Sequence, residues 1–325
     1  MKKYIIITSI FKPTEAVEKF SRNEDYQLIV VGDKKSPENW ECDGVEYLSV
    51  DDQVDLDFHL LSKLPYNHYC RKMVGYLKAI KDGADVIVDT DDDNIPYTDW
   101  AFPEMSGVFN EIDEKAFVNI YQYFSDMHIW PRGLPLNLIK KKFNFKATKK
   151  EQSVGIWQGL ADEDPDVDAI YRLVLNEPCY FEKKDPIVLT EGTISPFNSQ
   201  NTMFIKDLFP LLYLPSYVTF RFTDILRGLV AQPIMWLYGY RLGITEATVI
   251  QKRNEHDFFK DFESEIPCYI EGDKVIELVS NAVSKENSIT DNLKLAYNAL
   301  FENGIVVKEE LELLDDWIKD INSTL

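Results

Sequence analysis

Apolar strand-like runs and amphipathic stretches alternate along the first hundred residues. The run from Tyr4 to Ile10 is rich in β-branched residues and uninterrupted by charge, which is typical of a strand covered on both faces. The stretch after Thr14, a suitable N-cap, and the stretch that ends at Gly83 carry apolar residues at helical spacing. The pattern predicts strands at 4–10, 28–31 and 86–88 and helices at 14–22 and 68–82.

Strand–helix–strand order with short links predicts a parallel, doubly wound α/β sheet. Such sheets bind their ligands at the carboxyl ends of the strands. The three expected strands end at Thr8 and Ser9, at Gly32 and Asp33, and at the run 89–94. These polar residues are therefore predicted to gather in one place.

The remainder of the chain divides into a less regular part and a helical tail. Between residues 101 and 250 the pattern loosens, with many aromatics and several prolines, and extra strands and loops that hold a second substrate are expected there. The last forty residues carry two apolar stripes at helical spacing. This acidic tail is expected to serve structural packing or a homo-oligomer contact. The stripes are Leu293, Ala296, Tyr297 and Leu300, then Leu311, Leu314, Ile318 and Ile321.

Composition narrows the classes of function. The 325 residues include 35 basic and 55 acidic side chains, a net charge of 35 − 55 = −20, and 45% are hydrophobic. The hydrophobic content excludes global disorder, and the charge argues against nucleic acid as a partner. Small phosphate-bearing molecules stay possible, because a metal ion or a few cations can hold them.

The four cysteines and the apolar runs indicate the cellular compartment of the protein. The cysteines are far apart and form no CxxC pair, which argues against a zinc site or a disulfide framework and suits a reducing compartment. No run reaches the ~18 apolar residues of a membrane-spanning helix. A cytoplasmic protein without a membrane span is expected.

The strongest chemical signal is the acidic run Asp89-Thr90-Asp91-Asp92-Asp93-Asn94 after the third strand. Four carboxylates crowded at a strand end repel one another unless a cation neutralises them. Hard oxygen ligands without cysteine or histidine suit Mg²⁺ or Mn²⁺, which would take further ligands from a diphosphate. The alternative is a solvated acidic turn.

Arg71 and Lys72 form a second signal at the start of the helix that leads to this strand. Cations in a first helical turn oppose the helix dipole, so an anion is expected to compensate them. A diphosphate is the natural candidate, and the alternative is a pair of ordinary surface cations.

Ordered motifs spread over residues 1 to 265 resemble the STELLO glycosyltransferase family. More distantly, they are similar to the reversibly glycosylated polypeptides, which are UDP-arabinopyranose mutases. The resemblance implies a GT-A-like nucleotide-sugar fold with a mostly parallel sheet over residues 1–265, a helical extension over 266–325, and a UDP-sugar donor. The motifs are residues 11–14, 31–37, 71–80, 89–94, 130–135, 155–159 and 165–169.

The resemblance also implies roles for individual residues. Asp91 and Asp93 would occupy the DxD positions, with Asp93 as the direct metal ligand. Thr8 and Asp33 would face the base and the ribose. Arg132 aligns with the arginine that the mutases glycosylate, and Asp224 with an acceptor-side carboxylate; a buried, acid-paired arginine and a helix-capping aspartate are the alternatives. His256 is the candidate late metal ligand, although it does not align cleanly with the mutases.

Together these expectations describe a metal-dependent glycosyltransferase that uses Mn²⁺ or Mg²⁺, a nucleotide sugar and an unidentified acceptor. Two alternatives stay open. One is a UDP-sugar mutase or self-glycosylating protein, which the Arg132 match supports. The other is a non-catalytic scaffold that retains the fold.

Overall fold

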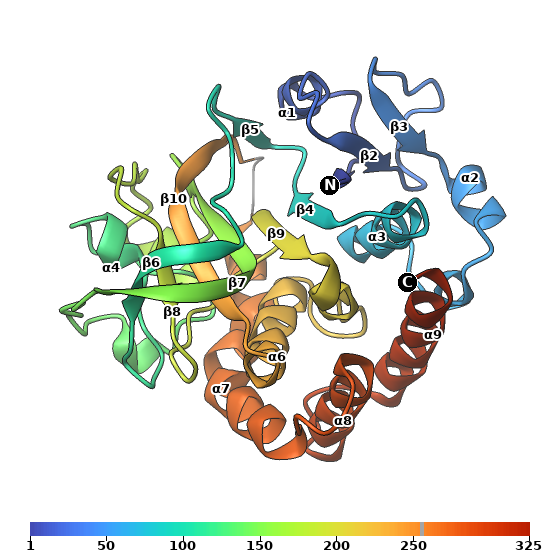
Figure 1. Cartoon of the computed structure of the whole chain (residues 1–325). Helices are drawn as coiled ribbons and strands as arrows, with labels where there is room; N and C mark the ends of the chain where they lie inside the picture. Colours follow the sequence, from blue (N-terminus) through green and yellow to red (C-terminus); the bar gives the residue numbers. More distant parts are fainter. Residues whose placement is uncertain (254–256) are drawn as a thin grey trace.

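The computed structural model describes residues 1–253 and 257–325 as an α/β structure in which helices surround a large sheet (Figure 1). The strands are β1 (Lys3–Thr8), β2 (Gln27–Val31), β3 (Val45–Leu48), β4 (Val86–Thr90), β5 (Asn94–Pro96), β6 (Ser106–Ile112), β7 (Thr148–Asp162), β8 (Ile187–Leu189), β9 (Asn201–Ile205) and β10 (Arg241–Gln251). The α-helices are α1 (Glu15–Phe20), α2 (Val50–Asp55), α3 (Lys72–Lys81), α4 (Tyr121–Phe124), α5 (Ala169–Val174), α6 (Thr223–Leu237), α7 (Phe258–Ala282), α8 (Ile289–Glu302) and α9 (Lys308–Thr324). Short 3₁₀ helices are η1 (His59–Ser62), η2 (Tyr69–Arg71), η3 (Leu136–Leu138) and η4 (Lys206–Leu212).

The strands of the described residues form one sheet in the order β3-β2-β1-β4-β9-β7-β6-β8-β10-β5, with a further pairing between β7 and β10. The expected α/β class is confirmed. The expected mostly parallel sheet holds only for β3, β2, β1 and β4, which are parallel to one another. From β9 onward parallel and antiparallel pairs mix, so the sheet as a whole is mixed.

Strand β1 is buried on both faces, as its sequence predicts. Tyr4 and Ile6 pack into the core on the α3 side of the sheet, whereas Ile5 and Ile7 pack into the core on the α1 side. Helix α3 lies close to the sheet at Gly75, where an added Cβ would come within 2.6 Å of the Ile6 side chain. This close contact fixes the start of α3, and with it the two cations there, beside the strand ends.

The five elements expected in this part of the chain form with small changes at their ends. Thr14 caps α1 and accepts a hydrogen bond from the Val17 amide. The helix expected from residue 68 begins with the 3₁₀ turn η2 and becomes α-helical at Lys72. Gly83 follows α3 with φ +85°, a conformation that favours glycine.

The C-terminal helices α7, α8 and α9 form an arc along one side of the molecule and end beside α3 (Figure 1). Helix α7 packs on α6 and α8, and α9 packs on α3 and η1. Helix α7 also runs across residues 265 and 266, between which the domain division is expected, and that division stays a prediction.

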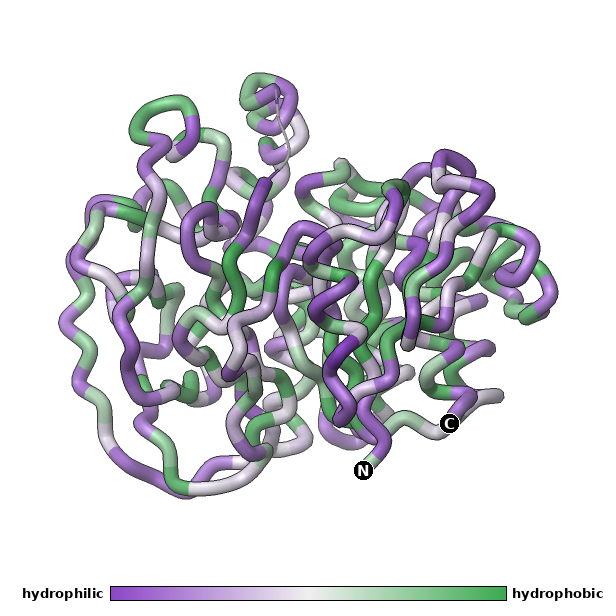
Figure 2. Tube along the Cα trace, turned by 90° about the horizontal axis from the view of Figure 1, so that it is seen from above, coloured by the Kyte–Doolittle hydropathy of each residue, from purple (hydrophilic) through white to green (hydrophobic). Residues whose placement is uncertain are grey.

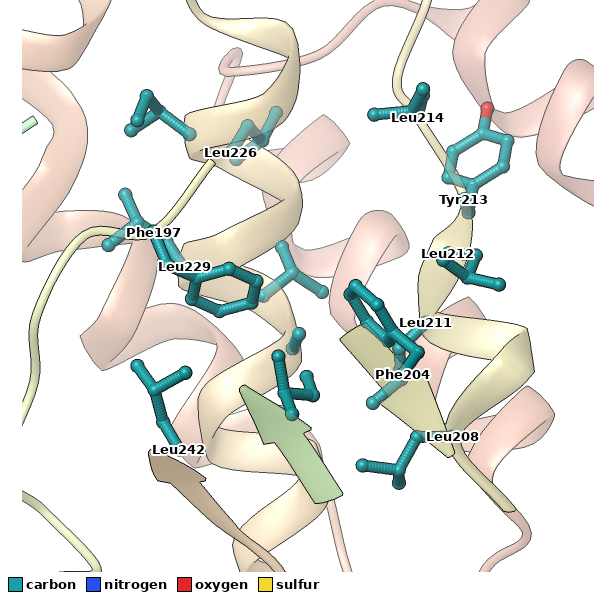
Figure 3. Close-up of a cluster of buried hydrophobic side chains, with 14 of the residues drawn as sticks. Phe197, Phe204, Leu208, Leu211, Leu212, Tyr213, Leu214, Leu226, Leu229 and Leu242 are labelled. Atoms are coloured by element: carbon teal, nitrogen blue, oxygen red, sulfur yellow. The ribbon is translucent and has the colours of Figure 1, made fainter. Parts of the chain in front are cut away.

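Apolar residues concentrate among the strands and inner helix faces, as the hydropathy view shows (Figure 2). One part of this core brings α6 against β9, β10 and the segment from Leu208 to Leu214 (Figure 3). Within residues 1–253 and 257–325, each helix is too short or too polar to span a bilayer.

Candidate functional site

Two adjoining cavities lie where β1, β2 and β4 reach their carboxyl ends. The first, the acidic cavity, measures about 220 Å³, and Asp91, Asp92 and Asp93 after β4 are among its lining residues. The second, the side cavity, measures about 200 Å³ and is lined mainly by residues that follow β1 and β2. The strand ends that the sequence predicts to lie together therefore do surround adjoining cavities. Both cavities are lined by Thr8, Tyr69, Asp92 and Phe220.

The buried strand β4 carries the acidic run into the first cavity. Asp89 is fully buried and forms ion pairs with Lys72 at 2.9 Å and with Arg227 at 2.6 Å. Thr90 and Asn94 both donate side-chain hydrogen bonds to the carbonyl of Gln200, at 2.7 and 2.9 Å. The backbone around the three cavity-lining aspartates is thus fixed on both sides.

Asp91 and Asp93 differ in how their oxygen atoms are used. Asp91 Oδ1 accepts a hydrogen bond from Lys72 Nζ at 2.5 Å. Asp93 Oδ2 accepts one from Gln251 at 3.2 Å, whereas Asp93 Oδ1 is buried without a hydrogen-bond partner in the described part of the chain. Burial raises the pKa of Asp91 to about 6 against the opposing charge of Lys72, and burial together with Asp92 raises the pKa of Asp93.

A divalent cation fits this donor set. Carboxylate oxygens are the ligands that Mg²⁺ and Mn²⁺ prefer. Asp93, whose buried Oδ1 has no partner within the described residues, is one of the residues that line the acidic cavity. No three His, Cys, Asp or Glu side chains of residues 1–253 and 257–325 are arranged to hold a metal by themselves. A cation bound by Asp91 and Asp93 would therefore take further ligands from a bound molecule. The predicted ligand His256 lies outside the described residues.

Lys72 lies behind the acidic cavity rather than in its lining. Its ammonium group contacts Asp89, Asp91 and, at 3.4 Å, the carbonyl of Ser199, so each of its three donors has an acceptor. The side chain is fully buried, and the two carboxylates raise its pKa despite that burial. Lys72 therefore supports Asp91 and, contrary to the expected phosphate contact, is not among the residues that line the acidic cavity.

Thr8, Asp33 and Arg71 all line the side cavity. Arg71 Nε donates to Gln53 Oε1 at 2.8 Å, and its guanidinium lies 4.3 Å from the centre of the Tyr66 ring. Its Nη1 is buried without a partner among the described residues. Arg71 is thus a cation of the side cavity with one donor that is not hydrogen-bonded.

His68 also lines the side cavity. Its ring stacks on Tyr69 with a centroid distance of 5.2 Å, and its Nδ1 accepts a hydrogen bond from the Cys70 amide at 3.1 Å. Burial lowers its pKa to about 4, so the ring is neutral at pH 7. Its position three residues before Arg71 is the signal that could have identified it.

Arg132 is buried at the acidic cavity between two carboxylates. Its Nε and Nη2 bind Asp166 at 2.9 and 2.8 Å, its Nη1 and Nη2 bind Asp224 at 3.0 and 2.9 Å, and Nη1 also donates to the carbonyl of Arg221. All five N–H donors of the guanidinium are therefore used. Gly133, which follows, has φ +87° and no room for a side chain beside Ile225.

Asp224 lies in the first turn of α6, and its main partner is Arg132. It also accepts backbone hydrogen bonds from Ser199 at 3.2 Å and Ile225 at 3.1 Å. Burial opposes ionisation of Asp224, but the charge of Arg132 outweighs it and lowers the pKa of the carboxyl. Asp224 is thus an ionised, well-anchored carboxylate and a weak base.

Two further arginines of the acidic cavity, Arg221 and Arg253, are absent from the sequence predictions. Arg221 pairs with Glu265 at 2.9 Å. Arg253 Nε forms an ion pair with Asp164 Oδ2 at 3.2 Å, although this buried atom has no hydrogen bond within the described residues. Burial and the neighbouring charges of Arg221 and Arg172 lower the pKa of Arg253. A bound anion would stabilise this cation.

Chemically, the two cavities combine a carboxylate pair for a cation, two arginines with an incompletely hydrogen-bonded guanidinium for an anion, and an ionised carboxylate held in place. The sequence profile described as "STELLO glycosyltransferases" matches residues 221–324. "Probable glycosyltransferase STELLO2" from Arabidopsis thaliana is 27% identical over 98% of this chain, and "Probable glycosyltransferase STELLO1" from the same plant is 26% identical over the same share.

The similarity extends beyond the 1–265 range in which the motifs lie, because the profile match continues to residue 324 through the C-terminal helices. The chain spans 44% of the length of each of the two relatives. These comparisons confirm the resemblance of this chain to the STELLO glycosyltransferase family.

Proposed function

We propose that the protein is a metal-dependent glycosyltransferase with a GT-A-like fold, which transfers a sugar from a nucleotide sugar, most simply a UDP-sugar, to an acceptor. The observation that carries the proposal is the pair of adjoining cavities, one with the unpartnered Asp93 oxygen and one with the unpartnered Arg71 donor. The names of the two Arabidopsis relatives, both probable glycosyltransferases, support the transfer reaction.

The donor would occupy both cavities. Its nucleoside fits the side cavity, where Thr8, Asp33 and Arg71 offer hydrogen bonds. Its diphosphate and sugar would extend into the acidic cavity, toward Asp91, Asp93 and Arg253. Asp91 and Asp93 would hold Mn²⁺ or Mg²⁺, which, when bound, neutralises charge on the leaving nucleotide.

The residues of this chain would contribute binding and orientation. Lys72 holds Asp91 in place from behind. Arg253 would bind a phosphate oxygen beside its ion pair with Asp164, and Asp224 would orient an acceptor hydroxyl. Because the pKa of Asp224 is lowered, its proposed role is to position the hydroxyl rather than to remove its proton.

The self-glycosylation alternative needs an arginine nitrogen free to attack the sugar. In this structure each N–H of Arg132 binds an acceptor, and Asp166 and Asp224 raise its pKa well above the usual value despite its burial. This arrangement favours a structural role for Arg132 and transfer to a separate acceptor.

The first prediction tests the metal and the nucleotide together. UDP at a hundredfold excess over its dissociation constant should stabilise the protein by about 2.7 kcal/mol when Mn²⁺ is present. Thermal unfolding measures this stabilisation. It is followed with UDP and Mn²⁺, with UDP and a chelator, and with Mn²⁺ alone. Equal stabilisation by UDP in the chelator would contradict the metal bridge, and no stabilisation in any condition would contradict the proposed donor.

The second prediction concerns the arginine that the sequence does not single out. Arg253→Gln should weaken UDP binding in the presence of Mn²⁺ by about 1.5–3 kcal/mol, the usual value of a hydrogen bond to a charged group. Lys252→Gln is the matched control, because the neighbouring Lys252 pairs with Glu163 on the surface. Calorimetric titration with UDP would show the difference, and equal affinity of the two variants would remove Arg253 from the proposed site.

A further inference from the structure

Helix α9 contributes a buried carboxylate that has no part in the roles proposed above. Glu310 lies in the first turn of α9 and is completely buried. Its Oε2 accepts hydrogen bonds from the backbone amides of Ser216 at 2.9 Å and Tyr217 at 2.7 Å, and Tyr213 donates its hydroxyl to Oε1. A side chain of the C-terminal helix therefore binds the backbone of a segment 94 residues earlier in the chain.

Within residues 1–253 and 257–325, no salt bridge to a cation involves this carboxylate. Burial raises the pKa of Glu310 to about 7, and within the described residues only the hydrogen bonds from Tyr213, Ser216 and Tyr217 oppose that effect. A buried charge is unfavourable unless its hydrogen bonds compensate it. These bonds are therefore the interactions that hold the carboxylate in the interior.

The bound segment leads directly to the two cavities. Phe220 lines both of them and Arg221 lines the acidic cavity, only three and four residues beyond Tyr217. On the far side, Ser264 of α7 accepts a hydrogen bond from the Arg221 amide at 3.0 Å. Tyr213 and Leu214 lie at the edge of the apolar cluster beside α6 (Figure 3).

We propose that Glu310 is a positioning residue of the ligand site, whose carboxylate fixes residues 213–221 and thereby holds Phe220 and Arg221 at the two cavities. The C-terminal helix then acts on the site through the side chain of Glu310. The amides of Ser216 and Tyr217 both depend on this one acceptor, since each donates to Glu310 Oε2. The effect on ligand binding rests on the proposed function, whereas the effect on the segment does not.

Asp320 provides a matched control in the same helix. It is also buried, and its two oxygens accept hydrogen bonds from the backbone amides of His59 and Leu60, each at 2.9 Å. Those residues belong to η1, which lines neither cavity. Glu310→Gln and Asp320→Asn thus make the same chemical change at two backbone-binding carboxylates, of which one leads to the cavities.

Calorimetric titration of both variants with UDP and Mn²⁺ tests the proposal. Glu310→Gln should bind about tenfold more weakly than wild type, within the usual range for a residue that acts through its neighbours. Asp320→Asn should bind like wild type. Wild-type affinity of Glu310→Gln, or an equal loss in both variants, would overturn the proposal.

Hydrogen exchange of the backbone amides gives a readout that needs no ligand. In the wild-type protein the amides of Ser216 and Tyr217 should exchange slowly although they lie in a loop, and in Glu310→Gln the peptide covering 213–221 should exchange at least tenfold faster than in Asp320→Asn. Fast exchange of these amides in the wild type would overturn the proposal, even where Glu310→Gln fails to fold. Failure of wild type to bind UDP would affect the proposed function alone.

Discussion

Replacement of Arg132 by methionine is expected to lower the free energy of unfolding by about 3–5 kcal/mol, the usual loss when one partner is removed from a buried ion pair. Asp166 and Asp224 would stay buried at the acidic cavity without the cation that binds both of them. Methionine keeps much of the apolar stem, so the loss would report the guanidinium rather than the packing. Urea denaturation of the variant and the wild type measures the difference.

Arg241→Met is the control for this change. Arg241 is partly exposed and faces Glu191 at 3.5 Å, and such a surface pair contributes about 0–1 kcal/mol. Wild-type stability of Arg132→Met would contradict the structural role assigned to the Arg132 network.

The same variant separates transfer to an acceptor from self-glycosylation. After incubation with a labelled UDP-sugar, the wild-type protein should carry no covalent label, because every N–H of Arg132 already binds an acceptor. Label on the wild type that is lost in a folded Arg132→Met protein would instead support the mutase alternative.

The part of the site that could be predicted from the sequence is the part built by local patterns. Strands β1 and β4 are buried runs, and in a parallel arrangement the residues that follow them must meet at one edge. That rule alone places Thr8 beside the acidic run, as the cavities show. The Thr14 cap could also be predicted, because its hydrogen-bond partner Val17 lies only three residues away.

Contacts over long sequence distances could not be predicted in this way. The sequence around Arg132 shows a glycine and prolines, but not the carboxylates that bind it, 34 and 92 residues further along the chain. The position of Lys72 at the start of a helix predicts that its side chain contacts a phosphate. Only the packing of α3 on the sheet shows that its ammonium group turns to Asp89 and Asp91 instead.

For the mixed sheet and helix α7, the hydrophobic periodicity of the sequence is not enough to predict the structure. Strand β7 begins with the exposed, polar sequence of residues 148–151 and becomes buried only near Val154, so its first half has no strand-like apolar pattern. Helix α7 contains Pro267 and only a few buried residues, and its helical pattern is weak. The direction of β9 beside β4 depends on tertiary pairing, which no local pattern specifies.

Arg253 could have been predicted as a site residue from the sequence. Both Arg253 and His256 follow the apolar stretch 248–250 in the sequence, and side chains after a strand end are expected to face the site. In the structure β10 runs beside β5, with Gln251 paired to Asn94, and this pairing brings Arg253 toward the acidic run.

Substitution of Asp93 by asparagine should abolish the metal-dependent part of UDP binding. Asp93 Oδ1 is the buried carboxylate oxygen of the acidic run without a partner in the described residues, so it is the position at which a cation would replace a missing interaction. The metal-dependent stabilisation of about 2.7 kcal/mol expected for the wild type at a hundredfold excess of UDP should fall close to zero.

The protein without ligand should keep its stability in this variant, because asparagine fills the same volume and relieves repulsion among adjacent carboxylates. Asp99→Asn, which removes a charge six residues later at an exposed ion pair with Lys183, is the matched control and should retain the full metal-dependent shift. Thermal unfolding of both variants with UDP, once in Mn²⁺ and once in chelator, measures the metal-dependent stabilisation of each variant. A full shift in Asp93→Asn would mean that the cation is held elsewhere, and the DxD assignment would then have to be abandoned.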